Sequence, residues 1–275
     1  MGVPVDEYLL RRSDAIQGPV LHLLGGPYVV IGGRRLEIPE GSKRVLVFVA
    51  LNGGRVERKH LAGMLWPLGD DNRAAGNLRS ALWRLRGAGV HLIETDKCAL
   101  MLRPDLVVDV SVIVDWARRM VEGPILPGDL RTPASWVDAL DLLPGWYDEW
   151  VLFERERLRQ RLLYALEALS RRLVEVGRCG EAVDAAMTAV GAEPLRESAQ
   201  RALIEAHLAA GNLVEARRIY HTYRSLLQRE LDVEPGVALA RLVLAPPGGR
   251  APDREGRAPA TVRPVPLRAV EPARA

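Results

Sequence analysis

Residues 70–86 read DDNRAAGNLRSALWRLR, and this stretch decides the fold of the N-terminal half of the chain. Leu78, Leu82 and Leu85 recur at i, i+4 and i+7, which predicts an α-helix with one apolar stripe. The opposite face carries four polar residues: Arg73, Asn77, Ser80 and Arg84. Arg, Asn and Ser side chains suit phosphates and base edges in a DNA major groove. Many Arg-rich helix faces are simply solvated, so the neighbouring segments must decide between the two interpretations.

The segments on either side predict a winged helix-turn-helix. Apolar spacing predicts two further helices, over residues 43–51 and 57–66, before the helix at 70–86. Short extended runs at 91–93 and 99–102 flank polar residues and predict a hairpin, the wing. Further upstream, three short runs predict a small antiparallel sheet: residues 20–24, 28–31 and 34–38. The predicted fold class is therefore mainly α with a small β component.

Three stretches resemble the SARP-type bacterial transcriptional activators, which join an OmpR-like winged helix to a helical bacterial transcriptional activation domain. They are NLRSALWRLR (77–86), LIETDKCALML (92–102) and LLPGWYDEWVLFERERLRQRLLYALEAL (142–169). The Leu-Pro-Gly-Trp-Tyr run before a long charged helix is the most specific of them. The resemblance covers about residues 18–240 and keeps the family's order of parts.

The predicted division has four parts. Residues 1–17 are an N-terminal extension, 18–104 the winged helix and 105–244 a helical domain, while 245–275 are a Pro/Ala/Arg-rich tail that we expect to be disordered. Charge supports a division of roles, because residues 34–103 hold thirteen Lys/Arg against seven Asp/Glu and residues 104–244 hold seventeen against twenty-two. A basic domain suits DNA and an acidic one a protein partner. Chance fluctuation in an Arg-rich chain is the alternative.

An internal repeat with an offset of 34 residues predicts tetratricopeptide-like helix pairs in the helical domain. Gly177 recurs as Gly211, and Ala182 recurs as Ala216. Small residues at fixed positions let paired helices approach closely and leave a face for another protein. The second copy departs from the pattern at His207, where an apolar residue is usual.

Catalytic and cofactor sites are not predicted. The glycine pairs lack the Gly-Lys-Ser/Thr of a phosphate loop, and the five histidines form no HExxH pattern. The carboxylates at 148–156 alternate with arginines, which favours ion pairs at i, i+4 over acid/base chemistry. The chain has only two cysteines, which favours a cytosolic protein. Its 275 residues are 48% apolar, which is enough to form two cores. No apolar run predicts a membrane span, and the N-terminus lacks the order of a signal peptide.

The tryptophans have different predicted roles. Trp66 and Trp116 are expected in the core, and Trp146 and Trp150 are expected to fasten the long helix after residue 148 to the preceding helix. Trp83 lies nearer the polar face of the 70–86 helix than the leucine stripe. It is expected either to pack on the wing or to stack beside sugar and phosphate.

The predicted function is sequence-specific DNA binding by a transcriptional regulator, an activator rather than an enzyme. Base or phosphate contacts are assigned to Arg73, Asn77, Ser80 and Arg84, and backbone positioning to Lys43, Arg44, Trp83 and Lys97. The resemblance implies direct-repeat operators, protomers side by side on DNA, a contact with RNA polymerase and a nucleoid-associated location. The alternative is a repeat-type interaction scaffold whose winged helix does not bind DNA.

Overall fold

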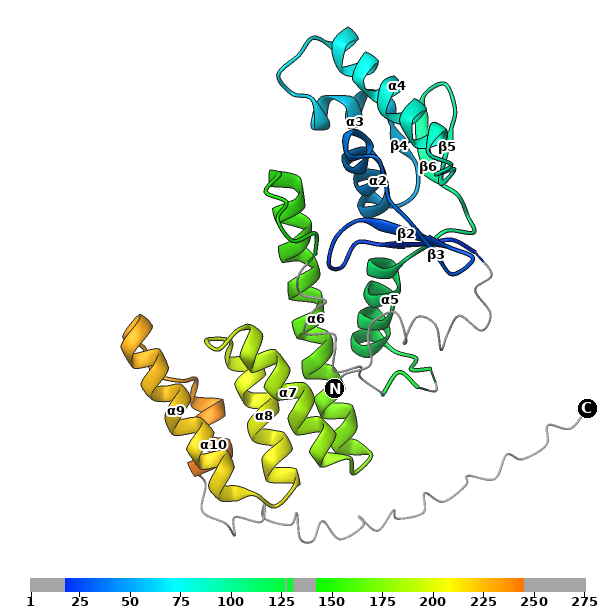
Figure 1. The fold of residues 1–275 in the computed structure, drawn as a ribbon. Coiled ribbons are helices and arrows are strands. Elements are labelled where there is room, and N and C mark those ends of the chain that lie inside the picture. The colour runs from blue at the N-terminus through cyan, green and yellow to red at the C-terminus, as the bar shows by residue number, and fades with distance from the viewer. Residues whose placement is uncertain (1–17, 127, 131–141, 245–275) are drawn as a thin grey trace, which may run out of the picture.

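The computed structural model describes residues 18–126, 128–130 and 142–244. The predicted N-terminal extension and C-terminal tail lie outside the described residues. The first half contains seven short strands and four helices (Figure 1). In chain order these are β1 (Val20–His22), β2 (Tyr28–Ile31), β3 (Arg34–Leu36), α2 (Glu40–Asn52), β4 (Val56–Glu57), α3 (Arg58–Leu65), α4 (Asp71–Gly87), β5 (Ile93–Thr95), β6 (Ala99–Leu102), β7 (Val107–Val108) and α5 (Asp109–Glu122).

The strands of this half form two sheets, one of four strands and one of three. One sheet has the order β3-β2-β1-β7, with β7 parallel to β1, and the other has the order β4-β6-β5. The sheet at residues 20–38 and the hairpin are confirmed, whereas β4 and β7 were not predicted. Each is two residues long and is defined only by its partner strand, so local periodicity carries no signal for it. The helix expected from residue 57 begins instead at Arg58, because Val56 and Glu57 pair with Leu100 and Ala99.

A buried carboxylate joins α5 to the first sheet. Asp109 is fully buried and accepts hydrogen bonds from the backbone N–H groups of Leu23 at 2.9 Å and Leu24 at 3.1 Å. Trp116, on the same helix, is fully buried as expected and donates its indole N–H to the carbonyl of Asp129 at 3.0 Å. One apolar core runs from Leu21 in β1 through Trp116 to Leu162 in the second half. The two halves therefore share a core.

The second half is a stack of helices (Figure 1). Its elements are α6 (Glu149–Glu175), α7 (Cys179–Ala192), α8 (Glu197–Ala209), α9 (Leu213–Leu231) and α10 (Val237–Leu244). The 34-residue offset has a structural counterpart, because Gly177 after α6 and Gly211 after α8 both have φ +77°. The residue after each glycine donates its N–H to a carbonyl five positions earlier, from Arg178 to Leu173 and from Asn212 to His207, both at 2.8 Å. A matching glycine turn thus connects the two helices within each pair, α6 to α7 and α8 to α9, as a tetratricopeptide-like repeat requires.

Within the described ranges, no helix combines the length and the apolar character that crossing a membrane would require.

Candidate nucleic-acid interface

The helix predicted to enter a groove, α4, is fixed from one side and free on the other. Asp70 caps its N-terminus by accepting a hydrogen bond from the N–H of Arg73 at 2.7 Å. The predicted leucine stripe is buried, and two alanines on the same face, one before the first leucine and one between the leucines, are buried with it: Ala74, Leu78, Ala81, Leu82 and Leu85. Most of these side chains pack with α2 and α3 in a second core. The alanines were missed because the stripe was identified from its large residues alone.

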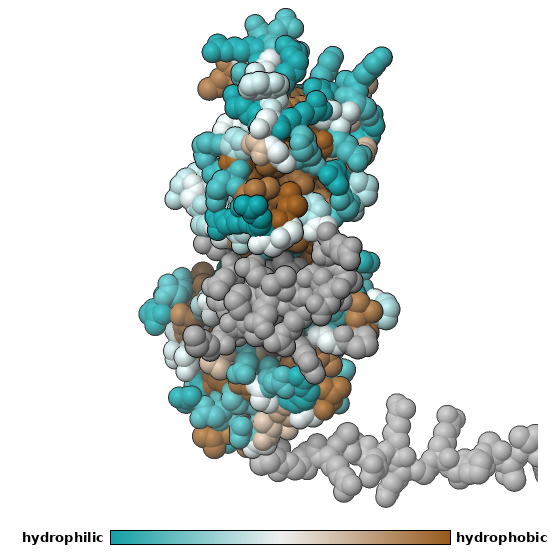
Figure 2. Space-filling view, turned by 45° about the vertical axis from the view of Figure 1, so that its right-hand side comes forward, coloured by the Kyte–Doolittle hydropathy of each residue, from teal (hydrophilic) through white to brown (hydrophobic). Residues whose placement is uncertain are grey.

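The outer face of α4 presents the predicted polar side chains. Arg73, Ser80 and Arg84 are exposed, and Asn77 is half-buried. In Figure 2 the end of the molecule that carries α3 and α4 is covered mainly by hydrophilic side chains, and apolar ones gather below it in the same half. Trp83 is 76% exposed, so its ring has little area left for packing on the wing. Of its two expected roles, that exposure suits a contact outside the chain.

Polar contacts hold α4 against the start of α2. The hydroxyl of Ser42 is buried and donates to the carbonyl of Ala81 at 2.8 Å. Arg84 donates to the carbonyl of Gly41 at 3.2 Å. A Cβ at position 41 would lie 2.9 Å from the guanidinium, so glycine lets Arg84 approach this closely. Arg84 therefore already contacts protein backbone, while its remaining N–H donors have room for an outside acceptor.

Three of the predicted residues come together at one hollow. Arg44 from α2 and Arg73 and Asn77 from α4 line a cavity of about 440 Å³ beside the loop between α3 and α4. Ser80 and Arg84 do not line it and lie farther along α4. The assigned residues thus form two groups along the same helix rather than one cluster.

The two cations assigned to α2 are paired within the chain. Lys43 lies 2.6 Å from the carboxylate of Glu40, and Arg44 forms an ion pair with Asp148 at the start of α6. Arg44 keeps 45% of its side-chain surface exposed, against 22% for Lys43. Arg44 is consequently placed where it touches both the helical half and the hollow beside α4.

The wing is built around Asp96, which the sequence interpretation did not single out. Its carboxylate accepts hydrogen bonds from the N–H groups of Cys98 and Ala99, both at 2.7 Å. These bonds, together with the ion pair to Arg55, lower the pKa of Asp96. Lys97 lies in the turn between β5 and β6, as predicted, and is exposed. An Asp three residues before the returning strand is a recognisable turn signal.

Further arginines fix the wing to the helices. Arg86 at the end of α4 donates to the hydroxyl of Thr95 in β5 at 3.2 Å. Arg58, at the start of α3, donates its backbone N–H to the carbonyl of Cys98 at 2.8 Å and its guanidinium to the carbonyl of Asp96 at 3.4 Å. Both arginines lie in charged stretches of sequence. No sequence pattern therefore distinguishes them from arginines that are simply exposed to solvent. The wing and the groove-facing helix are therefore held in one fixed arrangement.

The Leu-Pro-Gly-Trp segment connects the interface half to the helical half. The N–H of Leu143 donates to the carbonyl of Leu23 at 3.1 Å. Arg155 on α6 donates to the carbonyls of Leu142 and Leu143, each at 2.8 Å, and to that of Trp146 at 3.2 Å. The start of α6 is thereby fixed against the residues that directly follow β1.

Trp150 packs against α2, whereas a contact with the preceding helix was expected. Its ring meets Phe48 of α2 edge-on at 5.1 Å, and it meets Trp146 at 6.4 Å. Trp150 thus joins α6 to the winged helix, because the Leu-Pro-Gly-Trp segment folds back along β1. Trp66, expected in the core, is half-buried at the edge of the second core.

The charged run at the start of α6 forms ion pairs, at a different spacing from the one expected. Glu154 pairs with Arg157 and Glu156 with Arg159, in both cases at i, i+3. Arg159 also reaches Glu193 at the end of α7. In the described part of the chain, no three His, Cys, Asp or Glu side chains gather as a metal ion would need.

Comparisons with known proteins agree with this architecture. The family described as bacterial transcriptional activator domain matches residues 135–245. The chain is 34% identical over 253 residues to the regulatory protein AfsR of Streptomyces griseus, covering 84% of this chain and 24% of that protein. It therefore spans about a quarter of the length of this relative.

A solved structure shares the fold. Mycobacterium tuberculosis EmbR in complex with a low affinity phosphopeptide superposes with a TM-score of 0.62 at 18% identity, over 82% of this chain and 64% of EmbR. The winged helix followed by a helical domain is therefore confirmed as the fold class. Residues 135–245 therefore match the bacterial transcriptional activator domain family, and the sequence is similar to the regulatory protein AfsR over most of this chain.

Proposed function

We propose that this chain binds promoter DNA sequence-specifically, with α4 in the major groove, and activates transcription through its helical half. The observation that carries the proposal is the division of α4 into two faces. One face is sealed against α2 and α3, and the other presents Arg73, Ser80 and Arg84 to solvent beside an anchored wing. A winged helix bound to DNA needs this combination of a rigid base and a free cationic face.

The contacts divide into two classes. Arg73, Asn77, Ser80 and Arg84 read bases or bind phosphates, because Arg suits guanine edges and phosphates while Asn suits adenine. Trp83 and Lys97 position the chain on the sugar-phosphate backbone, together with Lys43 and Arg44. The last two must loosen their contacts with Glu40 and Asp148, or share them, when DNA binds.

The proposed partners have support from the arrangement of the halves and from the family match. The helical half carries the RNA polymerase contact, and two protomers bind side by side on direct repeats in a head-to-tail arrangement. The protein acts in the cytoplasm at the nucleoid. These assignments have support from the family match over residues 135–245, and each remains a proposal for this chain.

The experiment is a mobility-shift assay of the full chain on genomic fragments, repeated by anisotropy on the selected site at several salt concentrations. The Arg73→Ala/Arg84→Ala variant should bind that site at least about tenfold more weakly, since each base-reading arginine contributes ~1–3 kcal/mol. Arg171→Ala is the matched control, because Arg171 is an exposed arginine on α6. Equal binding by wild type and the double variant would contradict the assignment of α4.

One observation favours the scaffold alternative. Both cations of α2, Lys43 and Arg44, already form ion pairs inside the chain. This pairing is expected of a helix that does not bind phosphate. The same assay decides between the two functions. Steep salt dependence with sequence selection supports the regulator, whereas no binding even at low salt supports the scaffold.

A further inference from the structure

A groove between α5 and α6, at the junction of the two halves, has the features of a small-molecule site. One cavity of about 300 Å³ is lined by the end of α2, the first turns of α5 and the middle of α6. A second cavity of about 300 Å³ continues the groove toward the other end of α5. Val114 and Arg161 line both cavities. Together they reach the size range of ordinary ligand pockets.

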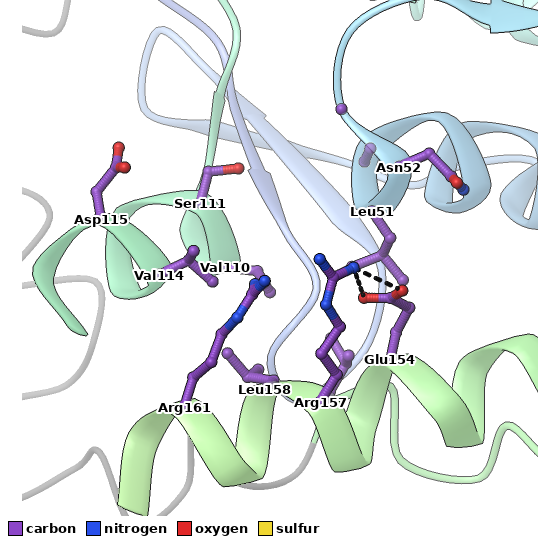
Figure 3. Close-up of a pocket in the computed structure, with 13 residues that line it drawn as sticks. Leu51, Asn52, Val110, Ser111, Val114, Asp115, Glu154, Arg157, Leu158 and Arg161 are labelled. Carbon is purple, nitrogen blue, oxygen red and sulfur yellow. Dashed lines mark hydrogen bonds and ion pairs between the residues drawn. The ribbon is translucent and has the colours of Figure 1, made fainter. Parts of the chain in front are cut away.

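Two arginines of α6 and a serine of α5 line the first cavity. Figure 3 shows Arg157 and Arg161 extending from α6 into the first cavity, and Ser111 above them on α5. Arg157 is paired with Glu154 at 3.2 Å. Arg161 is half-buried, and it has no hydrogen bond or ion pair with any other described residue. A guanidinium offers five N–H donors, so a partly buried one without an acceptor favours an anion.

The acidic residues of the groove do not fill that role. Glu154 is held by Arg157, and Asp115 lies 3.5 Å from Arg118 on its own helix. In Figure 3 Asp115 points away from both arginines of α6. Glu122, which lines the far end of the second cavity, is exposed.

The second cavity is suited to an apolar group. Its walls include Val114, Ala117, Val121 and the ring of Tyr164. Arg118 and Glu122 also line this cavity. Val121 is 53% exposed and Tyr164 is 55% exposed, and the guanidinium of Arg196 lies 4.2 Å from the centre of the Tyr164 ring. An occupant with an apolar body would cover both side chains while its charged group meets Arg161.

We propose that this groove binds a small organic anion, a carboxylate or a phosphate monoester, with its charged group on Arg161 and its apolar body against Val114 and Tyr164. The occupant would touch Leu51 and Asn52 at the end of α2 as well as α5 and α6, so it would tie the winged helix to the helical half. The inference does not depend on DNA binding.

The test titrates the full chain with phenyl phosphate, phenylacetate and neutral 2-phenylethanol at constant ionic strength, by calorimetry and by the shift in Tm. At least one of the anions should bind saturably, and the stronger one identifies the charged group, while 2-phenylethanol should not bind. Arg161→Met should weaken anion binding by about tenfold, and Arg161→Lys should weaken it less, because Lys keeps the charge and loses the bidentate fork. Arg171→Met, on the same helix and outside both cavities, should bind as wild type does.

Val114→Phe keeps Arg161 and narrows the groove, so it should also weaken binding if the apolar body lies where we place it. Circular dichroism and the Tm without probe show that each variant is folded. Three results would overturn the proposal: equal binding by wild type and Arg161→Met, equal binding of 2-phenylethanol and the anions, or no binding of either anion at millimolar concentration.

Discussion

The winged-helix half and the helical half are stabilised in different ways. In the helical half, turns 34 residues apart repeat the same backbone hydrogen bonds, and fully buried alanines at 182 and 216 let helices pack closely. In the winged-helix half, single polar contacts between distant segments fix the arrangement. Examples are the hydrogen bond from the N–H of Leu23 to the carboxylate of Asp109 and the one from the hydroxyl of Ser42 to the carbonyl of Ala81. Repetition makes the first kind of structure tolerant of local change, whereas each contact of the second kind has no duplicate.

The largest expected effect comes from the core that the two halves share. Trp116→Ala removes a fully buried indole and leaves the carbonyl of Asp129 without that donor, so it should cost about 3–5 kcal/mol of unfolding free energy. Denaturant unfolding followed by circular dichroism measures the loss. Trp83→Ala is the matched control, because the same substitution at a 76% exposed side chain should change stability by less than about 0.5 kcal/mol. Separate transitions for the two halves in the wild type would contradict the idea of one shared core.

A smaller effect should test whether the two repeats are equivalent. Ala182→Leu and Ala216→Leu each force a larger side chain into a fully buried position and should each cost about 1–3 kcal/mol. Near-equal costs in denaturant unfolding would support equivalence. Ala209→Leu, at an exposed position near the end of α8, is the control and should change stability little. A cost at only one of the two positions would show that the sequence repeat is not a packing repeat.

Substitution of the glycine in either repeated turn should lower the free energy of unfolding by about 1–2 kcal/mol. Gly177→Ala and Gly211→Ala place a Cβ at φ +77°, a left-handed conformation that costs other residues this much. Gly180→Ala, inside α7 with open space around its Cβ position, should instead stabilise by about 0.4–1 kcal/mol. The test is whether the turn variants lower the unfolding midpoint while Gly180→Ala raises it. Stabilisation by Gly177→Ala would refute the turn geometry.

The same contrast explains which features could be predicted from sequence. Leu78, Leu82 and Leu85 defined α4 because helical periodicity is a local signal, and Gly177 and Gly211 defined the repeat because the same pattern occurs twice. β4 and β7 were missed because two residues have no period, and each exists through a partner about 40 or more positions away in the chain. Asp96 could have been found from its turn signal. The contacts that Arg84, Arg86 and Arg155 make within the chain could not, since their acceptors are backbone carbonyls or a hydroxyl that only the tertiary structure brings near.

The smallest expected effect is local and concerns the wing. Backbone N–H groups of Cys98 and then Ala99 lower the pKa of Asp96 below its ordinary 3.8, so the folded turn prefers the carboxylate. The stabilisation is complete above the unfolded-state pKa and is lost as the pH falls through the lowered folded pKa. Amide exchange of Cys98 and Ala99, measured by NMR, should therefore accelerate in that acid range relative to amides in α4.

Asp96→Asn keeps an acceptor oxygen for both N–H groups and should lose this pH dependence, whereas Asp96→Ala should lose protection at every pH. Asp71→Ala, an exposed position in the first turn of α4, controls for general acid effects. If exchange at Cys98 has the same pH dependence in wild type and Asp96→Asn, the carboxylate does not hold the wing, and the fixed position of Lys97 must come from the contacts of Arg58 and Arg86 instead.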